Sequence, residues 1–263
     1  MFPAMPWDFC LLFLLLGVLL PWRGLRRIRR LLAMAQVTPR DRAKLYLSAM
    51  AWQWPLAAIA YWRATARGIT SFELGLRQDF SPGLLLVTAG GAALIAVLHW
   101  LNLKRMGSLQ HPGVAKMRNL ASRIFPHSRS EFALFALLCV TAGVCEEFLF
   151  RGFAMAALLK AGLAPWLVAL LTALLFGIAH IYQGRGGAIG TGVLGTCFAW
   201  TRIAYDSLLP VVVWHTVLDL VAGLAGARFL GSGNGNTSDL QSIVYGHENS
   251  VRESTGSTAE GQE

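Results

Sequence analysis

Long apolar runs, separated by short polar stretches, follow one another along most of the chain. Several of these runs approach or exceed the roughly 20 residues that an α-helix needs to cross a bilayer. They cover residues 7–22, 45–62, 83–103, 132–159, 165–182, 187–204 and 208–227. We therefore predict an all-α, polytopic transmembrane helix bundle with about seven membrane segments. The glycine-rich run 187–204 fits either a full crossing or a re-entrant helix.

The composition agrees with a membrane protein. Hydrophobic residues make up 55% of the chain and charged residues only 14%, whereas about a quarter of the residues of soluble domains are charged. After residue 230 the chain becomes rich in Gly, Ser, Asn, Thr and Glu. Such a segment buries too little apolar surface to offset the entropy lost on ordering. We expect residues 229–263 to form a disordered polar tail.

Basic residues concentrate beside the ends of the apolar runs, above all in residues 23–44 and 104–129, and give a net charge of +9. This placement follows the positive-inside rule and does not predict a nucleic-acid partner. We expect a multi-pass protein of the cell inner membrane, with the N-terminus outside and the basic loops in the cytoplasm. Because the basic cluster follows the first run, we expect that run to be a retained anchor rather than a cleaved signal.

Two adjacent carboxylates and one guanidinium interrupt the apolar run 132–159, at Glu146, Glu147 and Arg151. Unpaired at the bilayer centre, each would cost roughly 2.5–3.5 kcal/mol, which together rivals the stability of a domain. Glu147 and Arg151 are four residues apart and can pair on one helix face, while Glu146 points about 100° away. The pattern leaves two interpretations open: both carboxylates share the arginine in a structural role, or Glu146 stays free for chemistry.

Two later runs carry further polar groups. The segment FGIAH places His180 four residues after Phe176, and WHTVLD places His215 and Asp219 four apart on one helix face. A single intramembrane histidine is usually a packing or hydrogen-bonding residue. Several such groups together with a glutamate pair indicate a shared bundle interior or wet cavity, because polar intramembrane residues normally partner one another.

These residue types suit hydrolysis. Glu146 can act as the general base on a water molecule, with its basicity raised by an apolar site. His180 can hold that water or bind a metal that does so. His215 can donate to the oxyanion that develops on a scissile carbonyl, and Asp219 can orient its imidazole ring.

The patterns E-E-x-x-x-R, F-x-x-x-H and H-x-x-x-[N/D], in this order within apolar helices, resemble the CPBP family. This family comprises CAAX proteases and bacteriocin-processing (Abi) enzymes, including the Ras-converting CAAX endopeptidase. The resemblance implies an intramembrane endopeptidase that acts on a membrane-associated or C-terminally lipidated protein or peptide. It implies N-terminal membrane helices and basic loops over residues 1–130, a catalytic core over 131–228 and the tail over 229–263.

The resemblance also assigns roles to the motif residues. Glu146 and His180 would activate the water, and His215 with Asp219 would form the oxyanion side. The supporting residues would be Glu147 and Arg151, which brace the helix, and Phe176, which packs beneath His180. We expect no cofactor, because the set lacks a clear third strong ligand for zinc. The alternative is a divalent metal such as zinc, held by Glu146, His180, His215 and Asp219.

One position departs from the best-known family members, which have asparagine where this chain has Asp219. An ionised aspartate cannot donate a hydrogen bond, so support of His215 is its expected role. Depth along the bundle raises a second question, because His180 falls near the cytoplasmic end of its run and His215 about seven residues from the opposite side. Either the run 187–204 does not fully cross, or the boundaries differ.

Two other classes of protein also keep Glu, His and Asp inside a membrane. A transporter or proton relay would show related, interrupted halves, and no such internal symmetry is evident in the chain. A catalytically silent membrane scaffold would use the polar set for structure alone.

Overall fold

The computed structural model describes residues 5–76 and 80–230, and all regular secondary structure in these ranges is helical. The all-α prediction is therefore confirmed for the described part of the chain. The predicted disordered tail lies outside the described residues, apart from its first two positions. The helices are α1 (Trp7–Leu14), η1 (Leu15–Leu19), α2 (Leu20–Ala33), α3 (Pro39–Ala66), α4 (Pro82–Ser108), α5 (Pro112–Ile124), α6 (Arg129–Glu147), η2 (Phe148–Ala154), α7 (Met155–Lys160), α8 (Pro165–Ala179), η3 (Ile181–Gln183), α9 (Arg185–Tyr205) and α10 (Leu209–Phe229).

The predicted membrane segments coincide with these helices. In the described residues, four helical stretches are long and apolar enough to cross a membrane, and they are Trp7–Ala33, Pro82–Ser108, Arg129–Lys160 and Leu209–Phe229. The first and third of them each contain a short π-helical stretch, η1 and η2 respectively. The figure of seven segments remains a prediction, because α3, α8 and α9 do not belong to this set.

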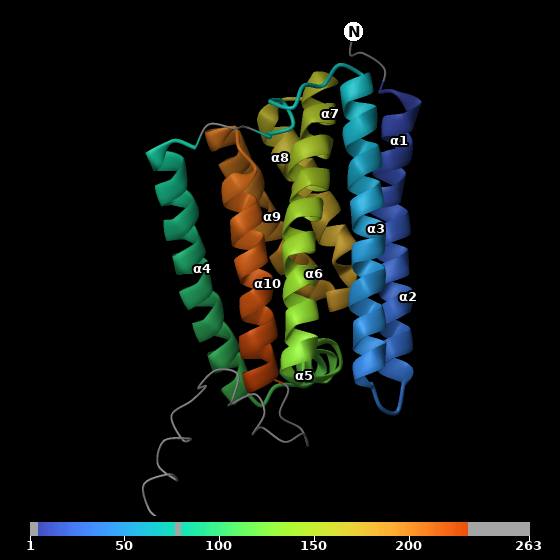
Figure 1. The fold of residues 1–263 in the computed structure, drawn as a ribbon, viewed down its shortest axis with the longest axis vertical. Helices are drawn as coiled ribbons and strands as arrows, with labels where there is room; N and C mark the ends of the chain where they lie inside the picture. Colours follow the sequence, from blue (N-terminus) through green and yellow to red (C-terminus); the bar gives the residue numbers. More distant parts are fainter. Residues whose placement is uncertain (1–4, 77–79, 231–263) are drawn as a thin grey trace, which may run out of the picture.

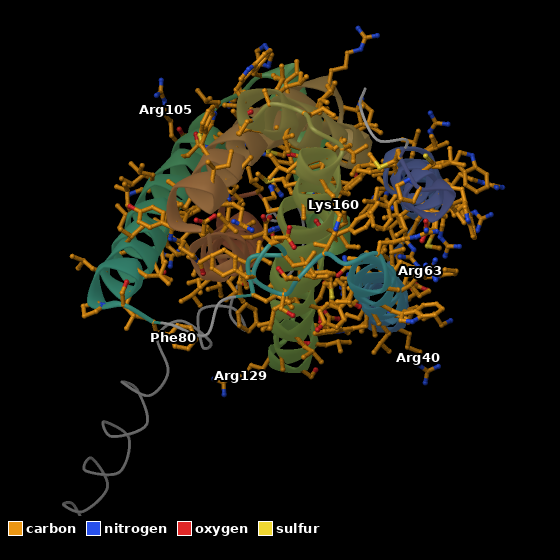
Figure 2. The ribbon with its side chains drawn as sticks, turned by 90° about the horizontal axis from the view of Figure 1, so that it is seen from above. Arg40, Arg63, Phe80, Arg105, Arg129 and Lys160 are labelled. Atoms are coloured by element: carbon orange, nitrogen blue, oxygen red, sulfur yellow. The ribbon has the colours of Figure 1, made fainter. Side chains whose placement is uncertain are left out.

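Most long helices run roughly side by side, and α5 lies across one end of the bundle (Figure 1). Seen along the bundle, the α6–α7 rod lies in the middle, with α4 and α10 on one side and α1, α2 and α3 on the other (Figure 2). α6 packs directly against both α3 and α10, and α8 packs against α9. The two glutamates that end α6 therefore lie at the centre of the fold.

The outer surface is apolar where the bundle would meet lipid. On α4, Leu86, Val97 and Leu98 are all more than half exposed. Such an extended apolar surface is unusual for a soluble monomer and suits hydrocarbon chains. With the four long apolar helices, it identifies an integral membrane protein.

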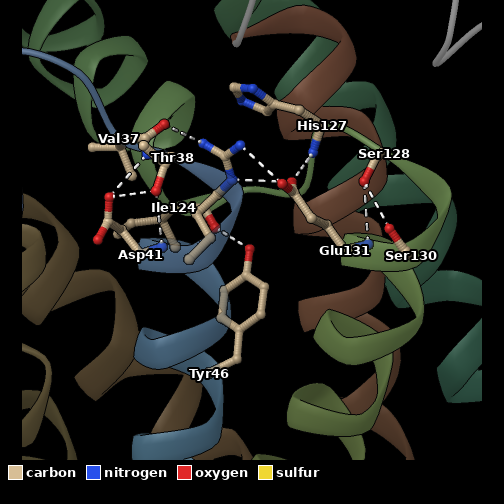
Figure 3. A network of polar contacts seen from close by, with 10 residues as sticks. Val37, Thr38, Asp41, Tyr46, Ile124, His127, Ser128, Ser130 and Glu131 are labelled. Carbon is tan, nitrogen blue, oxygen red and sulfur yellow. Dashed lines mark hydrogen bonds and ion pairs between the residues drawn. The ribbon is translucent and has the colours of Figure 1, made fainter.

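A polar network holds α3 to α6 at the end of the bundle that we call the basic end, where residues 23–44 and 104–129 lie (Figure 3). Arg42 forms a bidentate pair with Glu131, with both N–O distances at 3.0 Å. The backbone N–H of His127 donates to the same carboxylate at 2.7 Å. The Tyr46 hydroxyl donates to the carbonyl oxygen of Ile124. Bidentate pairing fixes orientation as well as distance, so it sets the register of α3 against α6.

A short loop, residues 67–76, closes the opposite end. Lys160, at the end of α7, donates to the carbonyl oxygen of Gly68 at 2.7 Å, and Leu208, just before α10, donates to that of Gly75 at 3.0 Å. Within the loop, Thr70 donates twice to the Glu73 carboxylate. These hydrogen bonds hold the pKa of Glu73 below its usual value.

The length of α8 explains how His180 can lie at a depth in the bundle similar to that of His215. The helix has 15 residues, or about 22 Å, which is less than the roughly 30 Å of a bilayer core. α8 begins at the end of the bundle that loop 67–76 closes, and α9 returns to that end, where Arg202 donates to the carbonyl oxygen of Glu73. His180 follows the last residue of α8, so it lies inside the bundle rather than at the basic end.

Candidate active site

The fully buried pair of Glu147 and Arg151 forms the base of the site. Arg151 Nη1 lies 2.9 Å from Glu147 Oε1, and both side chains are 0% exposed. Arg151 also donates to the carbonyl oxygen of Gly195 and lies over the Phe176 ring, 4.1 Å from its centre. These contacts compensate the two charges that the sequence places in an apolar segment. They also tie α6 and η2 to α8 and α9.

Glu146 faces a different set of neighbours. Its Oε1 accepts a hydrogen bond of 2.9 Å from Gln53 Nε2 on α3. Its Oε2 lies 3.7 Å from His180 Nε2 and is buried without a hydrogen-bond partner among the described residues. The two adjacent glutamates thus lie in different environments. Glu147 Oε1 is paired with Arg151, whereas Glu146 Oε2 faces a histidine nitrogen.

The orientation of His180 follows from its second nitrogen. Nδ1 lies 2.9 Å from the carbonyl oxygen of Phe176, which can only accept, so Nδ1 carries the hydrogen. In the neutral ring this leaves Nε2 as an acceptor, and Nε2 faces Glu146. The His180 ring packs on that of Phe176, with ring centres 4.5 Å apart, and Tyr182 flanks it at 5.7 Å.

His215 on α10 is held between two carboxylates. Its Nδ1 lies 2.7 Å from Glu147 Oε1, and its Nε2 lies 3.6 Å from Asp219 Oδ2. Since a carboxylate oxygen accepts, Nδ1 donates to Glu147. The rings of Phe176 and Phe198 enclose the imidazole. The tight contact that fixes this ring is therefore made by Glu147, whereas the sequence hypothesis gave that task to Asp219.

All seven motif residues belong to one connected set. Glu146 reaches His180, Glu147 reaches Arg151 and His215, and Phe176 contacts both histidine rings. Asp219 lies at the edge of the set, next to His215. The set draws on α6, η2, α8 and α10, so it exists only in the folded bundle.

Gln53 is a site residue that the sequence motifs did not reveal. It lies in the apolar run 45–62, and its amide oxygen is buried without a hydrogen-bond partner among the described residues. An uncharged amide costs less in an apolar helix than a carboxylate does, so it attracts less notice in the sequence. The sequence feature that could identify Gln53 is the presence of an amide side chain in a mainly apolar run. Polar residues inside membrane segments usually face a polar partner.

A cavity of about 810 Å³, which Glu146 and His180 line, extends to the basic end. Glu146, His180, Gln53 and Tyr182 line its inner part, and apolar side chains such as Leu149, Phe150 and Leu56 form its walls. Its outer part lies between α2 and α3 and is lined by basic residues. A mainly apolar cavity with a few convergent polar groups is typical of a ligand or substrate site.

The donor atoms do not match a tetrahedral zinc site. Within the described residues no group of three or more His, Cys, Asp or Glu side chains is arranged to hold a metal. His215 Nδ1 is engaged by Glu147, and His180 Nδ1 by a carbonyl oxygen. Glu146 Oε2 and His180 Nε2 are the paired donors that face the cavity, whereas catalytic zinc usually has three protein ligands.

Comparison with known proteins shows that the part of the chain bearing these residues is similar to one family. Residues 128–221 match the family model described as Type II CAAX prenyl endopeptidase Rce1-like. The match covers under half of the chain and includes every motif residue from Glu146 to Asp219. No curated protein and no solved structure was found to match the chain. The resemblance to the CAAX proteases is thereby confirmed for residues 128–221, and it indicates a protease of the CAAX type that acts on a protein or peptide at the membrane.

Proposed function

We propose that this protein is an intramembrane endopeptidase in which Glu146 and His180 activate a water molecule. The substrate is a membrane-associated or C-terminally lipidated protein or peptide of the CAAX type. The observation that carries the proposal is the facing pair of acceptors, Glu146 Oε2 and His180 Nε2, at 3.7 Å beside a cavity. Two acceptors at this separation suit a water molecule that donates one hydrogen to each.

Activation then needs only one proton transfer. Glu146 takes a proton from the water as the oxygen attacks the scissile carbonyl, and later passes it to the leaving amine. His180 holds the water through its second hydrogen, because its Nδ1–H is fixed by the Phe176 carbonyl. Gln53 holds the other oxygen of Glu146, which directs Oε2 toward the water.

In this proposal, His215 stabilises the oxyanion that forms on the scissile carbonyl. Its Nδ1–H donates to Glu147, so Nε2, which lies 3.6 Å from Asp219 Oδ2, is the nitrogen left to donate to the oxyanion. Glu147 on one side and Asp219 on the other support a positively charged ring, in which Nε2 also donates. An oriented donor of this kind typically contributes roughly 10²- to 10³-fold to the rate of acyl transfer. Asp219 thus acts through His215 in this proposal, in agreement with its inability to donate when ionised.

We propose that the reaction needs no metal, since the arrangement of donors described above favours a glutamate-activated water. The apolar walls of the cavity suit aliphatic side chains and a lipid-modified residue of the substrate.

The test uses wild type and Glu146→Gln in liposomes with a prenylated, internally quenched CAAX peptide. Glu146→Gln keeps the shape and the acceptor for Gln53 but removes the base, so we expect at least a hundredfold lower cleavage with unchanged thermal unfolding. Glu73→Gln, in loop 67–76, is the matched control and should cleave as wild type does. Equal cleavage by wild type and Glu146→Gln would refute the assignment. Ion or solute flux in the absence of peptide cleavage would indicate a transporter instead.

A further inference from the structure

Four arginines of α2 line the same cavity that Glu146 and His180 line at its inner end, and Arg23 and Arg27 are two of them. Arg23 and Arg27 are four residues apart, so they share one face of α2. Arg27 donates to Ser48 Oγ, and the Arg23 guanidinium lies over the Trp52 ring, 4.3 Å from its centre. These contacts hold both guanidinium groups between α2 and α3 rather than leaving them to extend freely into solvent.

Neither arginine has an acidic partner among residues 5–76 and 80–230. Within the part of the chain that the structure describes, no carboxylate forms an ion pair with Arg23 or Arg27. The acidic residues that line the cavity are Asp41 and Glu146. Asp41 accepts hydrogen bonds from the backbone N–H and hydroxyl of Thr38, at 3.0 and 2.7 Å, as part of a helix cap. The two neighbouring guanidinium groups therefore form a site for an external anion, and their planar donor geometry suits a carboxylate.

The distance from this anion site to Glu146 agrees with a short peptide. On α3, Ser48 marks the level of Arg27 and Gln53 marks the level of Glu146. Five residues of α-helix separate these two levels by about 7.5 Å along the axis. Arg23 lies over Trp52, about one turn nearer to Glu146, so Arg27 defines the far end of the anion site. Three extended residues span about 10 Å, which covers this rise and a modest lateral offset. In a C-a-a-X protein, three residues follow the lipidated cysteine.

The wall between the two levels also fits such a chain. Ala49 and Trp52, which lie between Ser48 and Gln53 on α3, line this part of the cavity. They present an apolar surface to the two aliphatic residues that precede the last residue of a C-a-a-X end.

We propose that Arg23 and Arg27 bind the terminal carboxylate of the substrate and so measure the length of the peptide released. This inference rests on the proposed function, because it places the scissile bond beside Glu146 and His180. It makes a free C-terminal carboxylate, about three residues beyond the scissile bond, part of what the enzyme recognises. Basic residues at this end also satisfy the positive-inside rule, but that rule does not require them to line the cavity.

The experiment compares two prenylated, internally quenched C-a-a-X peptides that differ only in a free C-terminal carboxylate or a C-terminal amide. Wild type, Arg23→Gln, Arg27→Gln and the control Arg105→Gln are reconstituted in phosphatidylcholine vesicles, so that no anionic lipid competes for the site. Arg105 lies near the end of α4 and does not line the cavity. The readout is the ratio of kcat/KM for the acid to that for the amide.

We expect wild type and Arg105→Gln to prefer the acid by roughly tenfold or more, the range expected for a hydrogen-bonded charge pair. Arg27→Gln and Arg23→Gln should bring the ratio close to one. Equal cleavage of both peptides by wild type, or an unchanged ratio in both arginine variants, overturns the proposal.

A binding measurement separates this proposal from the proposed function. If wild type cleaves neither peptide, the assignment of protease activity is at fault. Fluorescently labelled acid and amide peptides are then titrated against Glu146→Gln, alone and with Arg27→Gln added. Tighter binding of the acid that disappears with Arg27→Gln supports the carboxylate site, and equal binding of both peptides refutes it.

Discussion

His215 Nδ1 lies 2.7 Å from Glu147 Oε1, and the same oxygen accepts a hydrogen bond of 2.9 Å from Arg151. One buried carboxylate therefore neutralises a guanidinium within its own rod, α6–η2–α7, and orients an imidazole on α10. The adjacent glutamate is left to face the cavity. The two adjacent acidic residues in this apolar segment therefore differ in their contacts: Glu147 binds Arg151 and His215, and Glu146 lines the cavity.

Removing one member of the Glu147–Arg151 pair should be costly. Glu147→Gln leaves a guanidinium in the core without its carboxylate partner, and we expect a loss of about 3–5 kcal/mol in the free energy of unfolding. The double variant Glu147→Leu with Arg151→Met should regain much of that stability, since an apolar pair of similar volume is often tolerated. It should nevertheless remain inactive, because His215 has lost its partner. Thermal unfolding in detergent, with a cleavage assay alongside, measures both effects. A double variant as unstable as the single one would contradict this view of the pair.

Gln53 should act as a positioning residue. Gln53→Leu removes the hydrogen bond to Glu146 Oε1, and a bond to a charged group is worth about 1.5–3 kcal/mol. We expect kcat to fall roughly ten- to a hundredfold with a smaller change in KM. Trp54→Leu, at an exposed position on the same helix, is the control and should retain activity. A purely structural role for Gln53 would instead lower the unfolding temperature and leave kcat per folded molecule unchanged.

Gly143 should be required for the close approach of α6 and α10. A Cβ atom at this position would lie 2.2 Å from Thr216 Oγ1 and 2.9 Å from the carbonyl oxygen of Val212. Gly143→Ala should push the helices apart one turn before Glu147, destabilising the fold by about 1–3 kcal/mol and lowering activity. At Gly90 on α4 an added Cβ would meet no atom within 4 Å, so Gly90→Ala is the matched control. The unfolding temperatures of Gly143→Ala and Gly90→Ala are compared. Equal temperatures would show that α6 and α10 can separate enough to admit the added methyl group at little cost.

Cleavage should survive removal of divalent metal. In the proposed mechanism the water is held by Glu146 and His180, so dialysis against EDTA should leave kcat within about twofold of its starting value, a change of less than about 0.5 kcal/mol in the barrier. Activity before and after dialysis, with metal content measured in parallel, decides the matter. Loss of activity that returns on addition of zinc would favour the metal-dependent alternative.

Periodicity and spacing revealed much of this molecule. The apolar runs predicted where helices lie, and the four-residue spacing of Glu147 and Arg151 predicted their pairing. Contacts between helices were beyond such reasoning, because spacing along one helix says nothing about which face meets another. The His215–Glu147 contact depends on the register of α10 against α6, and the Gln53–Glu146 contact on that of α3.

The sequence also does not reveal where α8 ends or that Arg23 and Arg27 line the cavity. The apolar run 165–182 did not show that α8 ends at Ala179, inside the bundle, because apolar residues continue past that point. In the sequence, Arg23 and Arg27 indicate only the orientation of the protein in the membrane. Their place beside the cavity depends on how α2 packs against α3, for which the sequence of α2 offers no indication.

The polar network at the basic end also fixes the position of the Gln53 amide relative to α6. Arg42 and Gln53 are about three helical turns apart and differ by only about 20° around the axis, so both meet α6 from one face of α3. Inserting a single residue between them would turn Gln53 by about 100° and carry it away from Glu146. The number of residues between these two contacts is therefore a fixed dimension of the site.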